Sequence, residues 1–335
     1  MSVHEPVPTC VECPPFATKA VDTNPLSRRL MEDPRVRPDD VVRAHGGAAR
    51  WSTLRAGGVS RRALGDAVGT GLLVRAGPGT YALPTADPAV VAAISVNGFL
   101  SHASAAQMWD LDLLRRPTRP HVMVATTGAR RANGVLLHRV DRAQLIHAVR
   151  QPWPVTTIER TLVDCARTLP FPEALAVIDS ALRKQRIDRC AVRKLGESVR
   201  GGGAVAARRA LVAGDGRADS VGESATRAAA FDAGLPPPEL QCQIRFSPVH
   251  VIFTDMAWRH YRGRDTRLAV EFDGFGPHTI RSVFVRDRHR RNSLERAGWA
   301  LLEVTMSDVL ERYEETGAMI RKTLELRWQT APWHA

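Results

Sequence analysis

The first periodic part of the chain has apolar residues at helical spacing from Asp39 to Val68. This pattern predicts three short helices, which start at Asp39, Trp51 and Ser60, and Ser60 has the side chain of a helix N-cap. Two apolar runs then flank Gly77-Pro78-Gly79, a sequence typical of a β-hairpin. Three helices followed by a hairpin is the order of a winged helix-turn-helix, which we predict for residues 37–86.

The third predicted helix carries polar and positive side chains in its first turn. In a recognition helix this turn faces phosphates and base edges, where hydrogen-bond donors and positive charge are needed. We therefore predict DNA contacts from Ser60, Arg61 and Arg62, and from Arg75 in the hairpin. The alternative is a small helical domain with a solvated arginine face that contacts other proteins.

Residues 87–205 have a mixed pattern that predicts an α/β middle domain. Strands are predicted at 121–125 and 135–139, and helices at 155–166, 174–183 and 190–199. Four histidines in this region show no metal-ligand spacing, so we expect ordinary surface or strand histidines at His102, His121, His138 and His147. The glycines at 201–203 predict a domain boundary between residues 200 and 220.

This N-terminal half resembles the antitoxin component of AbiE-type (type IV) toxin–antitoxin systems. The resemblance covers roughly 40–200 and is carried by the segments 75–81, 100–106 and 155–164. It implies that the winged helix binds promoter DNA and that the following region has a regulatory or toxin-neutralising role. A cognate toxin protein is therefore a possible partner.

The C-terminal part, residues 215–330, alternates between helical and strand patterns. A helix is predicted from Ser220 to about Ala233, strands at 241–246, 251–258, 268–274 and 301–305, and a last helix at 309–326. We expect a mixed β-sheet flanked by helices. The whole chain is then an α+β multidomain protein.

Acidic residues gather on the predicted strands of this domain. Glu271 and Asp273 are two residues apart, so they lie on one face of a strand, and Asp255 on the neighbouring strand can face them. Clustered carboxylates are costly unless a cation neutralises them, and Mg²⁺ or Mn²⁺ prefers such oxygen ligands. Two alternatives stay open: each carboxylate pairs with an arginine, and Glu223 belongs to a capping box with Ser220.

The same domain resembles the very-short-patch-repair (Vsr) endonucleases and, more broadly, the PD-(D/E)XK nucleases. The resemblance is carried by Ser220-x-x-Glu223 and by the segments 234–238, 254–258, 269–274 and 297–299, with His278, Asp287, Arg288 and 292–294. It implies a restriction-endonuclease-like fold that hydrolyses DNA phosphodiesters with Mg²⁺ or Mn²⁺.

The Vsr-like resemblance also assigns roles to individual residues. It implies that Asp255 and Glu271 bind the metal and that His278 is the general base. We expect Asp273 and Glu223 to complete or support the metal shell. Asp273 stands where the general motif has Lys, which departs from the PD-(D/E)XK pattern. DNA-backbone contacts are expected from three arginines of the following helix, Arg288, Arg290 and Arg291.

Charge supports a nucleic-acid partner. The formal net charge is +12, and the segment 281–296 holds six arginines against Asp287 and Glu295. Such a surplus favours a polyanion, although an arginine-rich proteome would also raise it. The prediction is thus a DNA-binding protein with a metal-dependent endonuclease domain, and the alternative is a non-catalytic regulator or antitoxin.

The remaining features bound the cellular context. Five scattered cysteines argue against a disulfide framework, and Cys10 with Cys13 is only half a zinc site. No apolar run is long enough for a membrane span, and the N-terminus lacks the layout of a signal peptide. We therefore expect a cytoplasmic protein, with residues 1–36 as a disordered tail.

Overall fold

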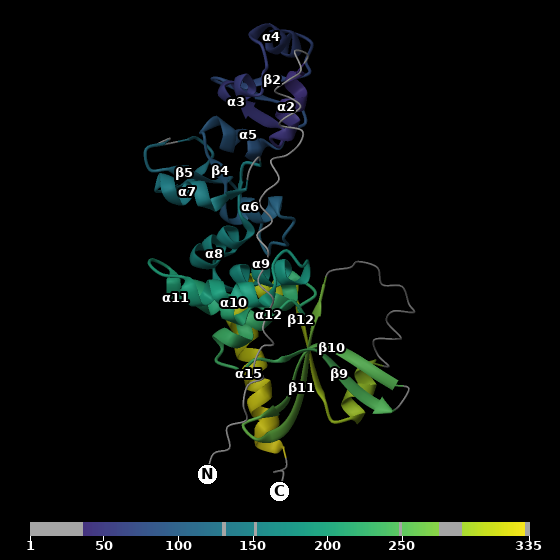
Figure 1. Ribbon diagram of the computed structural model, residues 1–335. Coiled ribbons are helices and arrows are strands. Elements are labelled where there is room, and N and C mark those ends of the chain that lie inside the picture. The colour runs from purple at the N-terminus through teal and green to yellow at the C-terminus, as the bar shows by residue number, and fades with distance from the viewer. Residues whose placement is uncertain (1–35, 129–131, 151–152, 248–249, 275–289, 332–335) are drawn as a thin grey trace. The chain divides into compact units, whose positions relative to one another are not determined.

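The computed structural model describes residues 36–128, 132–150, 153–247, 250–274 and 290–331 (Figure 1). The chain divides into two compact units, Met1–Thr85 and Ala86–Ala335. Helices and three separate β-sheets confirm the predicted α+β class. Among the described residues, no helix combines the length and the apolar character that crossing a membrane requires.

The first unit contains three helices and a small antiparallel sheet with strand order β1-β3-β2. Ser60 begins the third helix as predicted, because its hydroxyl accepts a hydrogen bond from the N–H of Ala63 at 3.1 Å. Leu54 and Val42 are fully buried in the core. The elements in chain order are α2 (Pro38–Ala44), β1 (Ala48–Arg50), α3 (Trp51–Ala56), α4 (Arg61–Gly69), β2 (Val74–Gly77) and β3 (Thr80–Ala82).

The second unit begins with a five-stranded mixed sheet of order β6-β5-β4-β8-β7. The prediction of one helix from Val155 is wrong at its start, because Val155 and Thr156 form a buried strand and α8 begins after the N-cap Thr157. The elements are α5 (Pro88–Ser95), β4 (Phe99–Leu100), α6 (His102–Met108), β5 (His121–Ala125), β6 (Leu136–Val140), α7 (Arg142–Ala148), β7 (Val149–Arg150) and β8 (Val155–Thr156).

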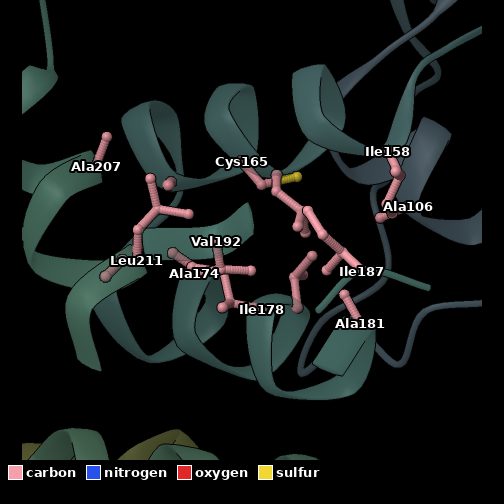
Figure 2. Packing of buried hydrophobic residues seen from close by; sticks show 14 of the residues in the cluster. Ala106, Ile158, Cys165, Ala174, Ile178, Ala181, Ile187, Val192, Ala207 and Leu211 are labelled. Carbon is pink, nitrogen blue, oxygen red and sulfur yellow. The ribbon is translucent and has the colours of Figure 1, made fainter. Parts of the chain in front are cut away.

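Four helices follow and bury a common apolar core, shown in Figure 2. Cys165 and Ile178 are fully buried in it, so this cysteine serves as a small core side chain. The helices are α8 (Ile158–Thr168), α9 (Phe171–Arg183), α10 (Arg189–Ser198) and α11 (Ala204–Ala213).

The C-terminal part of the second unit contains the predicted mixed sheet. Its order is β12-β11-β10-β9, with β11 and β12 parallel and the other pairs antiparallel. The predicted last helix is two helices, because Thr305 and Asp308 form a capping box that starts a separate short one. The elements are α12 (Val221–Asp232), β9 (Glu239–Ser247), β10 (His250–Tyr261), β11 (Arg264–Asp273), β12 (Ala300–Thr305), α14 (Met306–Glu311) and α15 (Tyr313–Thr330), with a helical segment at 290–296.

Small residues let α12 pack closely against its neighbours. A Cβ added at Gly222 would lie 1.9 Å from the ring of Phe272 on β11, and one at Gly317 on α15 would lie 2.5 Å from the carbonyl oxygen of Ala229. Both glycines are therefore required by close approach and not by backbone conformation. The contact at Gly222 brings the first turn of α12, with Glu223, up to the strand that carries Glu271.

The helical layer and the C-terminal sheet are linked within the second unit. Leu114 packs against the core on one face of the sheet, and Arg115 donates to the carbonyl of Leu310 at 3.0 Å. These contacts connect residues that precede the predicted boundary at 200–220 with residues that follow it. That boundary therefore stays a prediction.

Candidate functional site

An open groove of about 450 Å³ lies between α4 and the β2–β3 hairpin of the first unit. Arg61 and Arg75, both predicted from the sequence to contact DNA, line this groove together with Trp51 and Tyr81. The guanidinium of Arg61 lies 5.7 Å from the centre of the Trp51 ring, a cation–π distance. The groove therefore combines positive charge with aromatic surface.

The rest of the first unit is also basic and exposed near α4. Residues 37–84 contain seven arginines against three aspartates. Arg61 and Arg62 are exposed in the first turn of α4, and the Ser60 side chain caps that turn. A helix N-terminus with exposed arginines favours negatively charged groups.

The acidic site of the second unit starts at Glu223 in the first turn of α12. This side chain is buried, and its Oε2 accepts hydrogen bonds from the N–H of Asp219 at 2.8 Å and from Nε2 of Gln241 at 3.2 Å. Burial raises the pKa of Glu223, and the charges of Asp255 and Asp219 raise it further. Ser220 caps the helix as the capping-box alternative requires, but the Glu223 carboxylate reaches back to Asp219.

Asp255 and Glu271 meet at the end of the β10–β11 ladder. Met256 pairs with Val270 in this ladder, and one step further the Oδ2 of Asp255 accepts the N–H of Phe272 at 2.7 Å. Burial raises the pKa of Asp255. The Glu271 side chain is 17% exposed and forms an ion pair with Arg290 at 2.6 Å. Asp255 and Glu271 thus lie beside each other as predicted, and Arg290 partly neutralises them.

The other residues of the predicted nuclease site are distributed differently. Asp273 is exposed at the end of β11, and Arg291 forms an ion pair with Glu303 on β12. His278 and Arg288 lie outside the described residues, as do Cys10 and Cys13 of the predicted half zinc site. The arginine-pairing alternative is therefore realised at Glu271, whereas Glu223 and Asp255 have polar partners without a direct ion pair in the described part of the chain.

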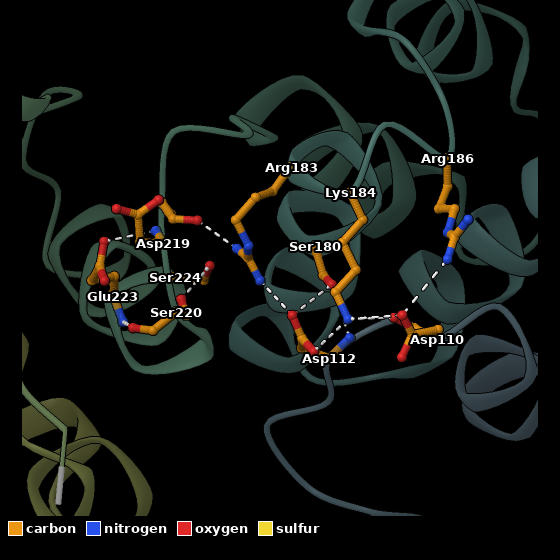
Figure 3. A network of polar contacts seen from close by, with 11 residues as sticks. Asp110, Asp112, Ser180, Arg183, Lys184, Arg186, Asp219, Ser220, Glu223 and Ser224 are labelled. Atoms are coloured by element: carbon orange, nitrogen blue, oxygen red, sulfur yellow. Dashed lines mark hydrogen bonds and ion pairs between the residues drawn. The ribbon is translucent and has the colours of Figure 1, made fainter. Parts of the chain in front are cut away.

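A polar network links the first turn of α12 to α9 (Figure 3). Arg183 on α9 donates to the carbonyl of Ala218 and to the Asp112 carboxylate, both at 2.5 Å. A cleft of about 600 Å³ borders this network and is lined by Arg183, Asp219 and Ser220 among others. Because Arg183 binds the segment just before Ser220, α9 helps to position Glu223.

One group of side chains was missed by the sequence reasoning. The sequence predicted ordinary surface or strand histidines, and His121 and His138 do lie on strands β5 and β6. The sequence spacing did not indicate that the ligand nitrogens of His102, His121 and His138 all lie within 4.8 Å of one another. Among the described residues, these three histidines form a group of possible metal ligands that lie within 4.8 Å of one another. The carboxylates of Glu223, Asp255 and Glu271 do not form such a group. His121 and His138 come from adjacent parallel strands, which sequence spacing alone does not reveal.

Burial changes the titration of these histidines. It lowers the pKa of His102 to about 2 and that of His138 to about 4, and mutual repulsion between the rings adds to both effects. Burial also lowers the pKa of His121. The three imidazoles are therefore neutral near neutral pH.

Comparison with known proteins supports a regulator in the first unit. Residues 37–84 match the family model described as transcriptional regulator, AbiEi antitoxin. The matched range contains α4, the hairpin and the groove between them. This confirms the AbiEi-type resemblance for these residues, whereas the Vsr-like resemblance of the C-terminal part stays a prediction.

Two relatives and one solved structure that this chain matches are proteins of Mycobacterium tuberculosis. Uncharacterized protein MT2308 (strain CDC 1551 / Oshkosh) and uncharacterized protein Rv2248 (strain ATCC 25618 / H37Rv) are each 36% identical to this chain over 166 residues. The alignment covers 49% of this chain and 59% of each relative, so this chain spans less than two thirds of their length. The crystal structure of RV2827C protein has a TM-score of 0.31 and 19% identity, covering 63% of this chain and 84% of that one.

Proposed function

We propose that this protein is a DNA-binding transcriptional regulator of the AbiEi antitoxin type. The observation that carries the proposal is the groove in which Arg61 of α4 and Arg75 of the hairpin face a common space. The order helix, strand, helix, helix and two strands is that of a winged helix-turn-helix, and the family match to residues 37–84 supports it. In this proposal α4 is the recognition helix and the β2–β3 hairpin is the wing.

Each polar residue of the proposed DNA interface, in the groove and in the first turn of α4, has a role that follows from its chemistry. Arg62 and Arg75 bind phosphates, which position the domain on the duplex without reading sequence. Arg61, held over the Trp51 ring, points its guanidinium from the first turn of α4 toward base edges in the major groove. Ser60 completes that turn by satisfying the N–H of Ala63, so the remaining N–H groups are available to phosphate oxygens.

A cognate toxin protein is the second partner in this proposal, and the cytoplasm is where such a regulator would act. The direct experiment titrates the full-length protein into labelled duplex from the region upstream of its own gene, with a scrambled duplex as control. A regulator binds the first duplex more tightly. Equal, weak binding to both at physiological salt would contradict a regulatory role.

A second candidate function is a divalent-metal-dependent DNA endonuclease in the C-terminal part. The observation that favours it is the position of Glu223. Burial raises the pKa of Glu223, and the charge of Asp255 raises it further, so a bound cation would stabilise the charged carboxylates. Asp255 and Glu271 would hold Mg²⁺ or Mn²⁺ there, with Glu223 and Asp273 in support. Such an ion would supply an activated water and stabilise the leaving oxygen.

In that candidate function, arginines of this chain would bind the DNA backbone. Arg290, which binds Glu271, would move to the phosphate backbone when DNA is present, and Arg291 lies beside it on the same helical segment. Supercoiled plasmid incubated with Mg²⁺ or Mn²⁺ tests the activity. Cleavage that is abolished in Asp255→Asn supports the candidate, and cleavage that persists in that variant, or its absence in the wild type, contradicts it.

A further inference from the structure

Three histidines from different elements converge in the second unit. His121 is the first residue of β5, and His138 lies in β6, where it pairs with Met123. Because residues two apart on a strand share a face, His121 and His138 are on the same face of the sheet. Their Nδ1 and Nε2 atoms, respectively, lie 3.1 Å apart.

His102 completes the group from the start of α6. Its ring stacks on that of His138, with centroids 3.6 Å apart, and only 5% of the residue is exposed. The preceding Ser101 donates its N–H to the carbonyl of His121 at 3.0 Å, which holds the beginning of α6 against β5. Backbone hydrogen bonds between these elements therefore hold the three histidines close together.

The backbone at His102 is strained. Its φ of 51° lies in the left-handed region, which costs a side chain other than Gly about 1 kcal/mol or more. Residues in such conformations often belong to functional sites, and here the strain presents the ring to the other two histidines. Nδ1 of His102 contacts the hydroxyl of Ser101 at 2.9 Å, so its Nε2 remains available.

We propose that His102, His121 and His138 bind one divalent transition-metal ion, with Zn²⁺ as the best match. Imidazole nitrogens suit Zn²⁺ and its neighbours, whereas Mg²⁺ prefers oxygen ligands. With Zn–N bonds of about 2.0–2.1 Å, two ligands of a tetrahedral site are about 3.3 Å apart. The 3.1 Å between His121 and His138 is close to that separation. The hydrogen bond between them would be replaced by two metal bonds.

The proposed site has three protein ligands, which leaves a fourth position for water or another ligand. The ion would connect α6, β5 and β6, so metal binding would stabilise the part of the second unit that precedes α8. This site shares no residue with the groove of the first unit or with the acidic site at Glu223. It does not depend on the proposed functions of either.

The experiment uses the full-length protein after treatment with a chelator and dialysis. Calorimetric titration with Zn²⁺ should show one high-affinity site per chain, and Co²⁺ should develop the intense visible absorption of a tetrahedral complex. Mg²⁺ should show no binding at this site. His121→Gln and His138→Gln should each weaken Zn²⁺ binding by about 100-fold or more, and should remove the Zn²⁺-induced rise in melting temperature.

His260→Gln is the matched control, because His260 is exposed on β10 and should leave the site unchanged. Circular dichroism checks that the site variants remain folded, and two independent variants guard against a failure of one. If Zn²⁺ binds both site variants as tightly as the wild type, or does not bind the folded wild type, the three histidines are not a metal site.

Discussion

The carboxylate of Asp179 on α9 and the guanidinium of Arg227 on α12 lie 2.6 Å apart, with side chains 0% and 4% exposed. Each group makes a further hydrogen bond: Asp179 accepts the N–H of Asp215 at 2.7 Å, and Arg227 donates to the carbonyl of Ala213 at 2.9 Å. This buried pair fastens the helix that carries Glu223 to the helical layer. The acidic site therefore depends on a contact outside the C-terminal sheet.

Removing one member of this pair should destabilise the whole second unit. Asp179→Ala leaves a buried guanidinium without its counter-charge, which typically costs about 3–5 kcal/mol. Chemical denaturation followed by circular dichroism measures the loss. The control is Glu197→Ala, which breaks an exposed ion pair with Arg193 and should cost about 1 kcal/mol or less. Equal effects of the two substitutions would show that the buried pair does not couple these elements.

Gly222→Ala should also be destabilising, because the new Cβ would lie 1.9 Å from the Phe272 ring. We expect a loss of about 1–3 kcal/mol, typical of overpacking. Phe272→Leu in the same chain should recover part of it, since the smaller side chain leaves room. Gly65→Ala on α4, with no atom within 4 Å of the added Cβ, is the control and should be neutral or stabilising. A double variant no more stable than Gly222→Ala would refute the steric explanation.

The sequence predicted most elements of this fold because their signals are local. The N-cap Ser60 and the hairpin at Gly77–Gly79 are specified within a few residues, and so is the alternation in β10 and β11. Val155 was misassigned because its strand depends on pairing with Leu100 and Arg150.

The candidate sites likewise could be predicted only in part from the sequence. Asp255 and Glu271 were predicted as neighbours because they lie on consecutive strands, and the structure places them so. His102, His121 and His138 were dismissed, because only the parallel register of β5 and β6 and the turn into α6 bring them together. Contacts that depend on register and on tertiary packing leave no periodic signal in the sequence.

The raised pKa values at the acidic site predict how stability depends on pH. Burial raises the pKa of Asp255 above 3.8, its ordinary value, so the protonated carboxyl is favoured in the folded state. This contribution to stability is complete below that ordinary value and is lost as the pH rises through the folded-state pKa. Asp255→Asn should therefore be more stable than the wild type near neutral pH and similar to it in acid.

Urea unfolding at the two pH values tests this prediction, and Asn retains an oxygen that can accept the Phe272 N–H. Glu197→Gln, at an exposed carboxylate, is the control and should change the free energy of unfolding by about 1 kcal/mol or less. A variant that is less stable than the wild type near neutral pH would mean that the charged carboxylate is favoured in the folded state.

The role of the β2–β3 wing in DNA binding can be tested at Arg75. Arg75 is exposed on β2 and lines the same groove as Arg61, so Arg75→Ala should weaken binding to all duplexes by a similar factor. The slope of log affinity against log salt concentration should become less steep by about the amount expected for one phosphate contact. Fluorescence anisotropy over a range of salt concentrations gives both quantities, and Lys322→Ala, an exposed residue of α15, serves as the control. An unchanged salt dependence in Arg75→Ala would remove the wing from the interface.

Binding of duplex DNA by α4 of the first unit is tested by the Arg61→Ala/Arg62→Ala double variant, which removes both exposed arginines from its first turn. Anisotropy with the upstream duplex should show affinity reduced by about 10-fold or more and a salt dependence smaller by about two contacts. Arg193→Ala/Lys322→Ala removes the same charge from exposed positions of α10 and α15 and should retain wild-type binding. Undiminished affinity and salt dependence in the α4 variant would mean that α4 does not bind the duplex.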